Sequence, residues 1–409
     1  MRPGAHERVA AALCGARTEG QAGGVLQALV DALLAEGLPL SRASTALHAL
    51  GPEWAGVHLI WVRGKPIQSI PREATIRNQQ VYLGSAPHAV IELGVPEVHV
   101  RLDGPRAELP YKFLDEMADA GATDYLCFPL DVRQGLSADT EHAYWGRQWI
   151  SFATDEARGF SDDEVMALRA LLPLISLRCA LEASKLTARA LLASYLGGNA
   201  SRRILGGAFR RGTAETLHAV IWYCDMQGFT TLSDVRPARE VVEVLDAYFD
   251  AVASPVDQRG GEVLKFIGDA ILAIFPVSAG PGEGMTAACA RALAAVADVR
   301  ANLERLNRER AGRGEAALGL GIALHQGEVS YGNIGAQNRL DFTVIGAVVN
   351  EACRVEAMTR TLGVDVLLTE SFVRVAELPA DAVVPLGAHR LKGVSGAVEL
   401  YGLPKAGAR

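Results

Sequence analysis

The segment 261–275 constrains the fold more than any other part of the chain. It reads GEVLKFIGDAILAIF, two apolar runs joined by a Gly-Asp dipeptide, which is typical of an antiparallel hairpin. Strand-like and helical runs alternate around it from about 217 to 403. We expect strands over 217–226, 318–335 and 340–346, a last strand over 364–370, and helices over 239–258, 285–310 and 348–360. Because hairpins are prominent, we expect an α/β sandwich with a mainly antiparallel sheet rather than a doubly wound fold.

The N-terminal part of the chain predicts a separate α+β module. The run VLQALVDALLAEG over 25–37 indicates a helix. Short apolar runs predict strands over 56–62, 80–84, 97–102, 125–130 and 148–154. The overall fold class is therefore α+β, with two dissimilar modules.

A helix is expected to start at Ser161 and to connect the two modules. Ser161 and Glu164 have the spacing of a capping box, and Gly197 is expected to end the helix near 196. An apolar stripe at spacings of three and four runs through it, made of Val165, Leu168, Leu172, Ile175, Cys179 and Leu186. The stripe is typical either of a parallel coiled-coil contact between two copies or of a helix packed on its own domain.

Composition excludes some classes of function. The net charge of −7 argues against a protein that binds nucleic acid or anionic membrane. The six cysteines include no CxxC pair, which points to a reducing cytoplasm and away from a zinc ribbon or a disulfide scaffold. No signal peptide and no membrane span are expected, because no apolar run reaches about 18 residues.

Two aspartates stand out because apolar strands surround them. Asp225 closes the run AVIWYC, and Asp269 lies in the middle of the predicted hairpin. Brought together, the two carboxylates would make a hard-oxygen site for Mg²⁺. The segment that follows Asp225 runs from strand to helix, so its backbone N–H groups could hold a polyphosphate; it consists of Met226, Gln227, Gly228, Phe229 and Thr230. The alternative is a pair of turn aspartates that accept backbone hydrogen bonds.

Five ordered strings resemble the catalytic domain of the class III adenylyl/guanylyl cyclases. They are CDMQGFTTLSD, GGEVLKFIGDAILAIF, GIALHQGEVSYGNIG, DFTVIGAVVNEACRVE and HRLKGVSGAVELYGL, and they cover a little under half of the chain. The resemblance implies a ferredoxin-like α/β sandwich. It also implies that Asp225 and Asp269 bind two Mg²⁺ or Mn²⁺ ions per site, and that Asn350 and Arg354 stabilise the transition state.

The resemblance extends to the residues that select the base. Lys265 matches the lysine that accompanies adenine, where a guanylyl cyclase usually has glutamate, and Lys392 matches a lysine that contacts the terminal phosphates. Thr343 replaces the aspartate of many adenylyl cyclases and resembles the class IIIb subgroup, some members of which respond to bicarbonate. The family's second lysine near Lys392 is replaced by Ser395. These matches imply ATP as the substrate and leave GTP open.

The family builds its active site between two catalytic domains, so the resemblance implies a homodimer. The expected function is an adenylate cyclase that converts ATP to 3′,5′-cyclic AMP and pyrophosphate by two-metal-ion catalysis. The alternatives are a guanylate cyclase, a non-catalytic nucleotide-binding or dimerisation module, and a GGDEF-type dinucleotide cyclase, which the Asn350/Arg354 helix opposes.

The N-terminal module is similar to the second half of a GAF domain, a family that often senses small molecules. We expect a GAF-like regulatory domain over 1–160, a helical linker and dimerisation segment over 161–212, and the cyclase domain over 213–405. The signal, a small molecule or another input, is not identified by the residues. The histidines and tryptophans of this module could indicate a haem or chromophore. The histidines have no paired spacing, which is more typical of surface or core residues, so a bound cofactor stays an open alternative.

Overall fold

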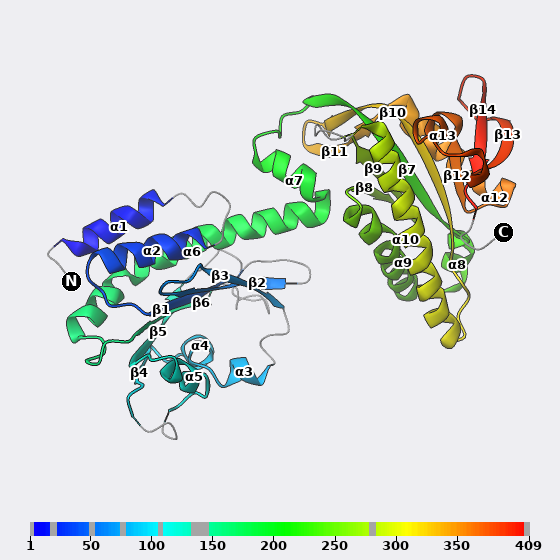
Figure 1. Cartoon of the computed structure of the whole chain (residues 1–409). Coiled ribbons are helices and arrows are strands. Elements are labelled where there is room, and N and C mark those ends of the chain that lie inside the picture. Colours follow the sequence, from blue (N-terminus) through cyan, green and yellow to red (C-terminus); the bar gives the residue numbers. More distant parts are fainter. Residues whose placement is uncertain are drawn as a thin grey trace. The chain divides into compact units, whose positions relative to one another are not determined.

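The computed structural model describes residues 4–16, 23–48, 54–73, 79–104, 109–131, 147–277 and 284–404. Contacts divide the chain into two compact units, Met1–Ser194 and Tyr195–Arg409. Figure 1 labels their helices and strands. Within the described residues, no helix is both long and apolar enough to cross a membrane.

The N-terminal unit is a six-stranded antiparallel sheet with helices on both faces. Its strands lie in the order β3-β2-β1-β6-β5-β4. They are β1 (Arg42–His48), β2 (Trp54–Val62), β3 (Gln68–Glu73), β4 (Val98–Arg101), β5 (Asp124–Asp131) and β6 (Arg147–Thr154). The helices are α1 (Ala5–Gly15), α2 (Gly24–Ala35), α3 (Gln80–Leu83), α4 (Ala86–Ile91), α5 (Phe113–Asp119) and α6 (Asp162–Leu196).

Alternation along the strands gives this sheet two different faces. Ile150 and Phe152 of β6 pack with α2 and α6, whereas Trp149 and Ala153 lie on the side of α4 and α5. Figure 1 shows α2 and α6 on one side of the sheet and α4 and α5 on the other. The helix predicted over 25–37 and four of the five predicted strands are confirmed.

The predicted strand over 80–84 is wrong, because Gln80–Leu83 is the short helix α3. An apolar run of this length cannot be assigned to strand or helix from its pattern alone. The strand β1 was not predicted. Its sequence, RASTALH, contains small and polar residues at buried positions and so lacks the apolar signal of a strand.

The helix α6 begins with the predicted capping box. The Ser161 backbone N–H donates to Glu164 Oε2 at 2.8 Å, and the Glu164 N–H donates to Ser161 Oγ at 3.4 Å. The predicted stripe lies in or against the core of the N-terminal unit, with Val165, Leu168 and Ile175 fully buried there. For this stripe the structure therefore shows the second alternative, a helix packed on its own unit.

The C-terminal unit contains a mainly antiparallel sheet in the order β13-β14-β12-β10-β7-β9-β8, with β11 paired to β10. Among the strands that the structure describes in this unit, only β10 and β12 run parallel. Its strands are β7 (Ala214–Gln227), β8 (Glu262–Ile267), β9 (Ala270–Pro276), β10 (Gly319–Ala336), β11 (Arg339–Ile345), β12 (Val366–Thr369), β13 (Val384–Arg390) and β14 (Ala397–Gly402). Its helices are α7 (Gly198–Leu205), α8 (Phe229–Val235), α9 (Ala238–Gln258), α10 (Met285–Gly312), α11 (Ala347–Glu356), α12 (Thr359–Leu362) and α13 (Glu370–Val375).

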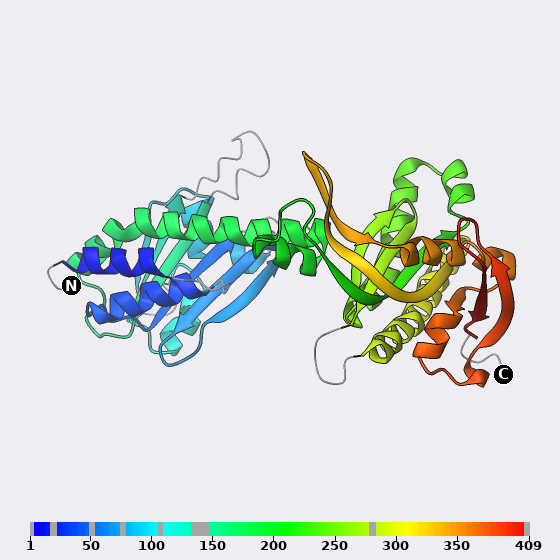
Figure 2. The same cartoon turned by 90° about the horizontal axis from the view of Figure 1, so that it is seen from above.

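The sheet of the C-terminal unit separates two cores. Val220, Trp222 and Cys224 of β7 pack with α9 and α10, whereas Ala219 and Ile221 pack on the side of α7 and α11. The long hairpin of β10 and β11 runs out from the body of this unit (orange in Figure 2). The predicted antiparallel sandwich is thus confirmed, but the segment 364–370 is not the last strand, because β13 and β14 follow it.

Candidate active site

The β8–β9 hairpin places Asp269 beside the end of β7. Only Gly268 and Asp269 separate the two strands, and Gly268 has φ +65°, the left-handed conformation that a two-residue turn favours. The next residue, Ala270, pairs with Asp225 across β7 and β9. The predicted hairpin therefore brings the two predicted metal-binding aspartates to one edge of the sheet.

The carboxyl groups of Asp225 and Asp269 lie close enough for the charge of Asp269 to act on Asp225, because the residue next to Asp269 pairs with Asp225. Burial, followed by the charge of Asp269, raises the pKa of Asp225 to about 6. The backbone N–H of Met226 donates to the Asp225 carboxylate and Arg360 adds a positive charge, and both act in the opposite direction. Two carboxylates held this close require a proton or a cation between them.

A third carboxylate, Glu356 at the end of α11, lies near this pair and was not predicted. Its side chain is buried, and burial together with the charge of Asp225 raises its pKa to about 7. Thr359 Oγ1 donates to Glu356 Oε1 at 3.3 Å. Glu356 comes two residues after Arg354, and helical periodicity places the two side chains on different faces of α11. The predicted role of Arg354 therefore did not point to Glu356.

The donor set fits a hard divalent cation. Carboxylate oxygens are the ligands that Mg²⁺ and Mn²⁺ prefer, and Mg²⁺ commonly takes one or two carboxylates together with phosphate oxygens and water. In the part of the chain that the structure describes, no group of three or more His, Cys, Asp or Glu side chains is arranged around one metal position. The two aspartates are therefore the residues that could hold the metal.

The segment 226–230 forms the turn from β7 into α8. Gly228 has φ +84°, and the short helix α8 starts at Phe229. The Met226 side chain is buried in the core, and Phe229 packs partly against the same core. Only backbone groups of Met226 could therefore face a ligand, while Thr230 is exposed.

Lys265 lies on β8 opposite the β10–β11 hairpin. Its ammonium forms an ion pair with the carboxylate of Asp341 on β11. Thr343, two residues along the same strand, shares the face of Asp341. The structure thus places the two predicted base-selecting residues on adjoining elements. Asp341 was missed, although strand alternation back from Thr343 could have found it.

Asn350 and Arg354 lie on the exposed side of α11. Ala352 and Val355 bury the opposite side of the helix against the sheet. Among the described residues neither Asn350 nor Arg354 forms a hydrogen bond or an ion pair, and the arginine whose charge acts on Asp225 is Arg360. Lys392 is also exposed, in the turn between β13 and β14. In one copy of the chain, none of these three residues is among the groups that act on the pKa of Asp225.

Comparison with known proteins shows what the C-terminal unit is similar to. Residues 214–404 match the family model of the adenylate and guanylate cyclase catalytic domain. An adenylate cyclase of Anabaena cylindrica is 33% identical over 196 residues, which are 46% of this chain and 37% of that protein. Adenylate cyclase 1 of Rhizobium meliloti is 31% identical over 200 residues, 48% of this chain and 29% of that protein. The chain thus spans well under half the length of these curated relatives.

Solved structures of cyclases are also similar to this chain. The adenylyl cyclase CyaB of P. aeruginosa is 22% identical, with a TM-score of 0.42 and coverage of 47% of this chain and 97% of that chain. The guanylyl cyclase Cya2 is 29% identical, with a TM-score of 0.40 and coverage of 48% and 97%. The family match covers residues 214–404, a little under half of the chain, so the C-terminal unit is similar to the catalytic domain of the adenylate and guanylate cyclases.

Proposed function

We propose that the C-terminal unit is an adenylate cyclase, which converts ATP to 3′,5′-cyclic AMP and pyrophosphate. The observation that carries this proposal is the pairing of β7 with the β8–β9 hairpin, which brings Asp225 and Asp269 together at one end of the sheet. The likeness to two curated adenylate cyclases supports the substrate. A half-buried, mutually repelling pair of carboxylates destabilises a fold, so its presence in this unit favours a bound cation over a structural role.

Asp225 and Asp269 would hold two Mg²⁺ or Mn²⁺ ions. When bound, these ions would favour loss of the proton from the ribose 3′-hydroxyl and offset the charge of the triphosphate. The chain itself contributes position: β7 and the β8–β9 turn fix the two carboxylates, and the turn over 226–230 offers backbone N–H groups to the phosphates. Lys392 would contact the terminal phosphates.

Adenine recognition would rest on Lys265 and Thr343. A lysine ammonium can only donate hydrogen bonds, which suits the N1 acceptor of adenine and opposes the N1–H donor of guanine. The ion pair with Asp341 uses one of the three ammonium donors and leaves the others for the base. The resemblance to the class IIIb subgroup rests on Thr343. A response to bicarbonate is proposed from that resemblance alone.

A second copy of the chain would complete the site. Asn350 and Arg354 are exposed on α11 and have no partner among the described residues, as expected for groups that act on a substrate held by the other copy. Their i, i+4 spacing puts both side chains on one face, from which Asn350 could orient the ribose and Arg354 could meet charge on the phosphate. The active enzyme is therefore proposed to be a homodimer with two equivalent sites.

The N-terminal unit would regulate the cyclase through α6. Its antiparallel sheet, with helices on both faces, supports the GAF-like assignment. Besides its buried stripe, α6 has exposed apolar side chains at Leu177, Leu181, Leu191 and Tyr195. Their separations of 4, 10 and 4 residues fit a heptad seam, so this second stripe is the proposed contact between two linker helices.

The proposed function is tested with the purified full-length protein. ATP and GTP are supplied separately with Mg²⁺ or Mn²⁺, and cyclic nucleotide and pyrophosphate are measured. We expect cyclic AMP and pyrophosphate in equal amounts from ATP, and loss of both with a chelator or in Asp269→Ala. Cyclic GMP as the preferred product would instead identify a guanylate cyclase. No product from either nucleotide, also with the fragment 200–409, would refute a cyclase and favour a binding module.

A further inference from the structure

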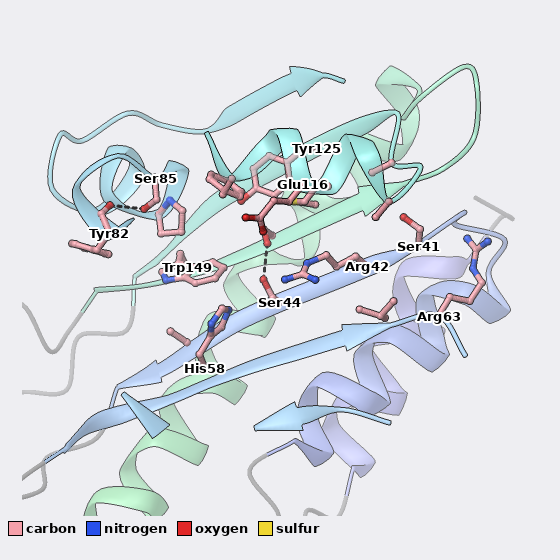
Figure 3. Close-up of a pocket in the computed structure, with 18 of the residues that line it drawn as sticks. Ser41, Arg42, Ser44, His58, Arg63, Tyr82, Ser85, Glu116, Tyr125 and Trp149 are labelled. Carbon is pink, nitrogen blue, oxygen red and sulfur yellow. Dashed lines mark hydrogen bonds between the residues drawn. The ribbon is translucent and has the colours of Figure 1, made fainter. Parts of the chain in front are cut away.

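The N-terminal unit contains a cavity of about 680 Å³ that the proposed catalytic chemistry does not use. It lies on the face of the sheet that carries α4 and α5, over β1, β2, β5 and β6 (Figure 3). A volume of this size is typical of sites for small organic ligands. The opposite face of the same sheet packs against α2 and α6 and is apolar.

Polar side chains replace apolar ones on the cavity side of the sheet. Ser44 of β1 and Ser151 of β6 are 4% exposed, and their hydroxyl groups hydrogen-bond to each other at 3.0 Å. Leu47 and Phe152, which point to the other face, are part of the apolar core. A buried sheet face gains stability from apolar side chains, so its polar lining indicates a surface shaped for a polar partner.

His58 of β2 presents an unpaired donor to this cavity. It is 9% exposed, and its Nδ1 accepts a hydrogen bond from the Arg72 guanidinium. Burial, aided by the charges of Arg72 and Arg42, lowers the pKa of His58 to about 3, so the ring is neutral and carries its proton on Nε2. Among the described residues this buried Nε2 has no hydrogen-bond partner. The ring lies at the cavity wall beside Trp149 (Figure 3).

Two arginines in the cavity lack a carboxylate partner. In the described structure neither Arg42 nor Arg72 forms an ion pair, whereas Arg63 at the same cavity binds Asp155 at 2.9 Å. Burial lowers the pKa of both Arg42 and Arg72. The charge of Glu116 acts on Arg42 but no ion pair forms, and no carboxylate contributes to the pKa shift of Arg72. A partly buried guanidinium that lacks an ion pair is unfavourable, and an anion from solution would relieve it.

The charges that line the cavity leave one positive charge in excess. Three arginines face two carboxylates, Glu116 and Asp155, and His58 is neutral. Aromatic rings form part of the wall. The ring centroids of Trp149 and His58 are 5.3 Å apart, and those of Tyr125 and Phe113 are 5.6 Å apart. The cavity thus combines one excess positive charge, a buried donor and flat apolar walls.

We propose that this cavity binds a small organic molecule with one anionic group and a flat apolar body, such as an aromatic carboxylate. Arg42 and Arg72 bind the anionic group, His58 Nε2–H donates to one of its oxygens, and the ring lies among Trp149, Tyr125 and Phe113. This binding goes beyond the proposed cyclase function and does not depend on it. If the cyclase proposal holds, the ligand is a candidate for the signal that the N-terminal unit receives.

The test measures binding to the full-length protein in the absence of nucleotide. Benzoate and indole-3-acetate are titrated by calorimetry, and their uncharged amides serve as matched probes. We expect one molecule per chain and at least tenfold weaker binding of each amide. Phenyl phosphate and inorganic phosphate distinguish a phosphoryl from a carboxylate head group, and preference for phenyl phosphate would still support the site. Equal binding of acid and amide, or no binding by any aromatic anion, would overturn the proposal.

Variants of the two arginines locate the site. Arg42→Gln and Arg72→Gln should each weaken binding of the best probe at least tenfold. Arg169→Gln is the matched control, because Arg169 pairs with Glu97 at 2.7 Å outside the cavity. Thermal unfolding of each variant checks that it is folded, and one folded variant suffices. Unchanged affinity in a folded Arg42 or Arg72 variant would overturn the assignment. Cyclic nucleotide production is measured separately, so its failure is distinct from a failure of binding.

Discussion

Replacing Asp269 by asparagine should stabilise the metal-free protein while abolishing its activity. The pKa of Asp225 rises from 3.8 to about 6 in the fold. One pKa unit corresponds to about 1.4 kcal/mol, so the whole shift corresponds to about 3 kcal/mol of destabilisation above pH 6. Burial of Asp225 is the largest cause of this pKa shift, and the charge of Asp269 is the next. Because Asp225 is partly exposed, solvent screens the repulsion, and we expect Asp269→Asn to recover about 1 kcal/mol.

The sign of this effect depends on pH. A carboxyl with a raised pKa destabilises the fold only where it is ionised, so the gain should be full above pH 6 and should vanish below pH 3.8. About 1 kcal/mol corresponds to a rise of about 2–4 °C in the midpoint of thermal unfolding of a unit of this size. Asp246→Asn, which removes an exposed carboxylate of α9, is the matched control and should leave the midpoint unchanged.

Thermal unfolding at pH 7.5 in chelator and in Mg²⁺ or Mn²⁺ provides the assay. The wild-type protein should gain stability when metal is added, because the cation relieves the same repulsion. Asp269→Asn should lose most of this gain together with cyclic nucleotide formation. A variant that is less stable without metal, or that keeps the full stabilisation by metal, would refute the assignment of the carboxylate pair.

Three further substitutions or conditions test other parts of the account. Lys265→Glu should lower the ratio of kcat/KM for ATP to that for GTP at least tenfold. An unchanged ratio would show that Lys265 does not select the base. Gly261→Ala should destabilise the C-terminal unit by about 1–3 kcal/mol in urea unfolding, since a Cβ there would lie 2.7 Å from Val256 and 2.8 Å from Phe275. Burial lowers the pKa of His325 from 6.5 to about 4, so it stays neutral in the fold. The contribution of His325 to the free energy of unfolding should therefore fall by about 1.4 kcal/mol per pH unit as the pH drops from 6.5 towards 4. In His325→Gln, the free energy of unfolding should depend less steeply on pH over this range. An equally steep dependence in both proteins would contradict this reasoning.

The fold of the C-terminal unit could largely be predicted because its local signals agree. The Gly-Asp turn between two apolar runs predicts the β8–β9 hairpin, and the pairing of β9 with β7 then puts Asp269 next to Asp225. The strands β13 and β14 were missed because exposed residues alternate irregularly along them, with a register shift between Pro385 and Gly387. A pattern of this kind carries little periodic signal.

The residues whose charges act on the predicted site residues were harder to predict than the site residues themselves. Asp341 acts on Lys265 and Glu356 acts on Asp225 through contacts between distant segments. Strand alternation from Thr343 indicates the face of Asp341 but not its partner, and no spacing in the sequence indicates Glu356. The polar cavity of the N-terminal unit is a similar case. Ser44 and Ser151 lie 107 residues apart, and only the pairing of β1 with β6 brings their hydroxyl groups together.

Mixing two inactive variants tests most directly whether one copy supplies the metal-binding aspartates and the other supplies the arginine. Full-length Asp225→Ala and Arg354→Ala should each be inactive alone. In an equal mixture, half of the dimers would contain both chains and one of their two sites would be intact, so about a quarter of the wild-type cyclic AMP production should return. No recovery from two folded chains that exchange partners would contradict the shared site.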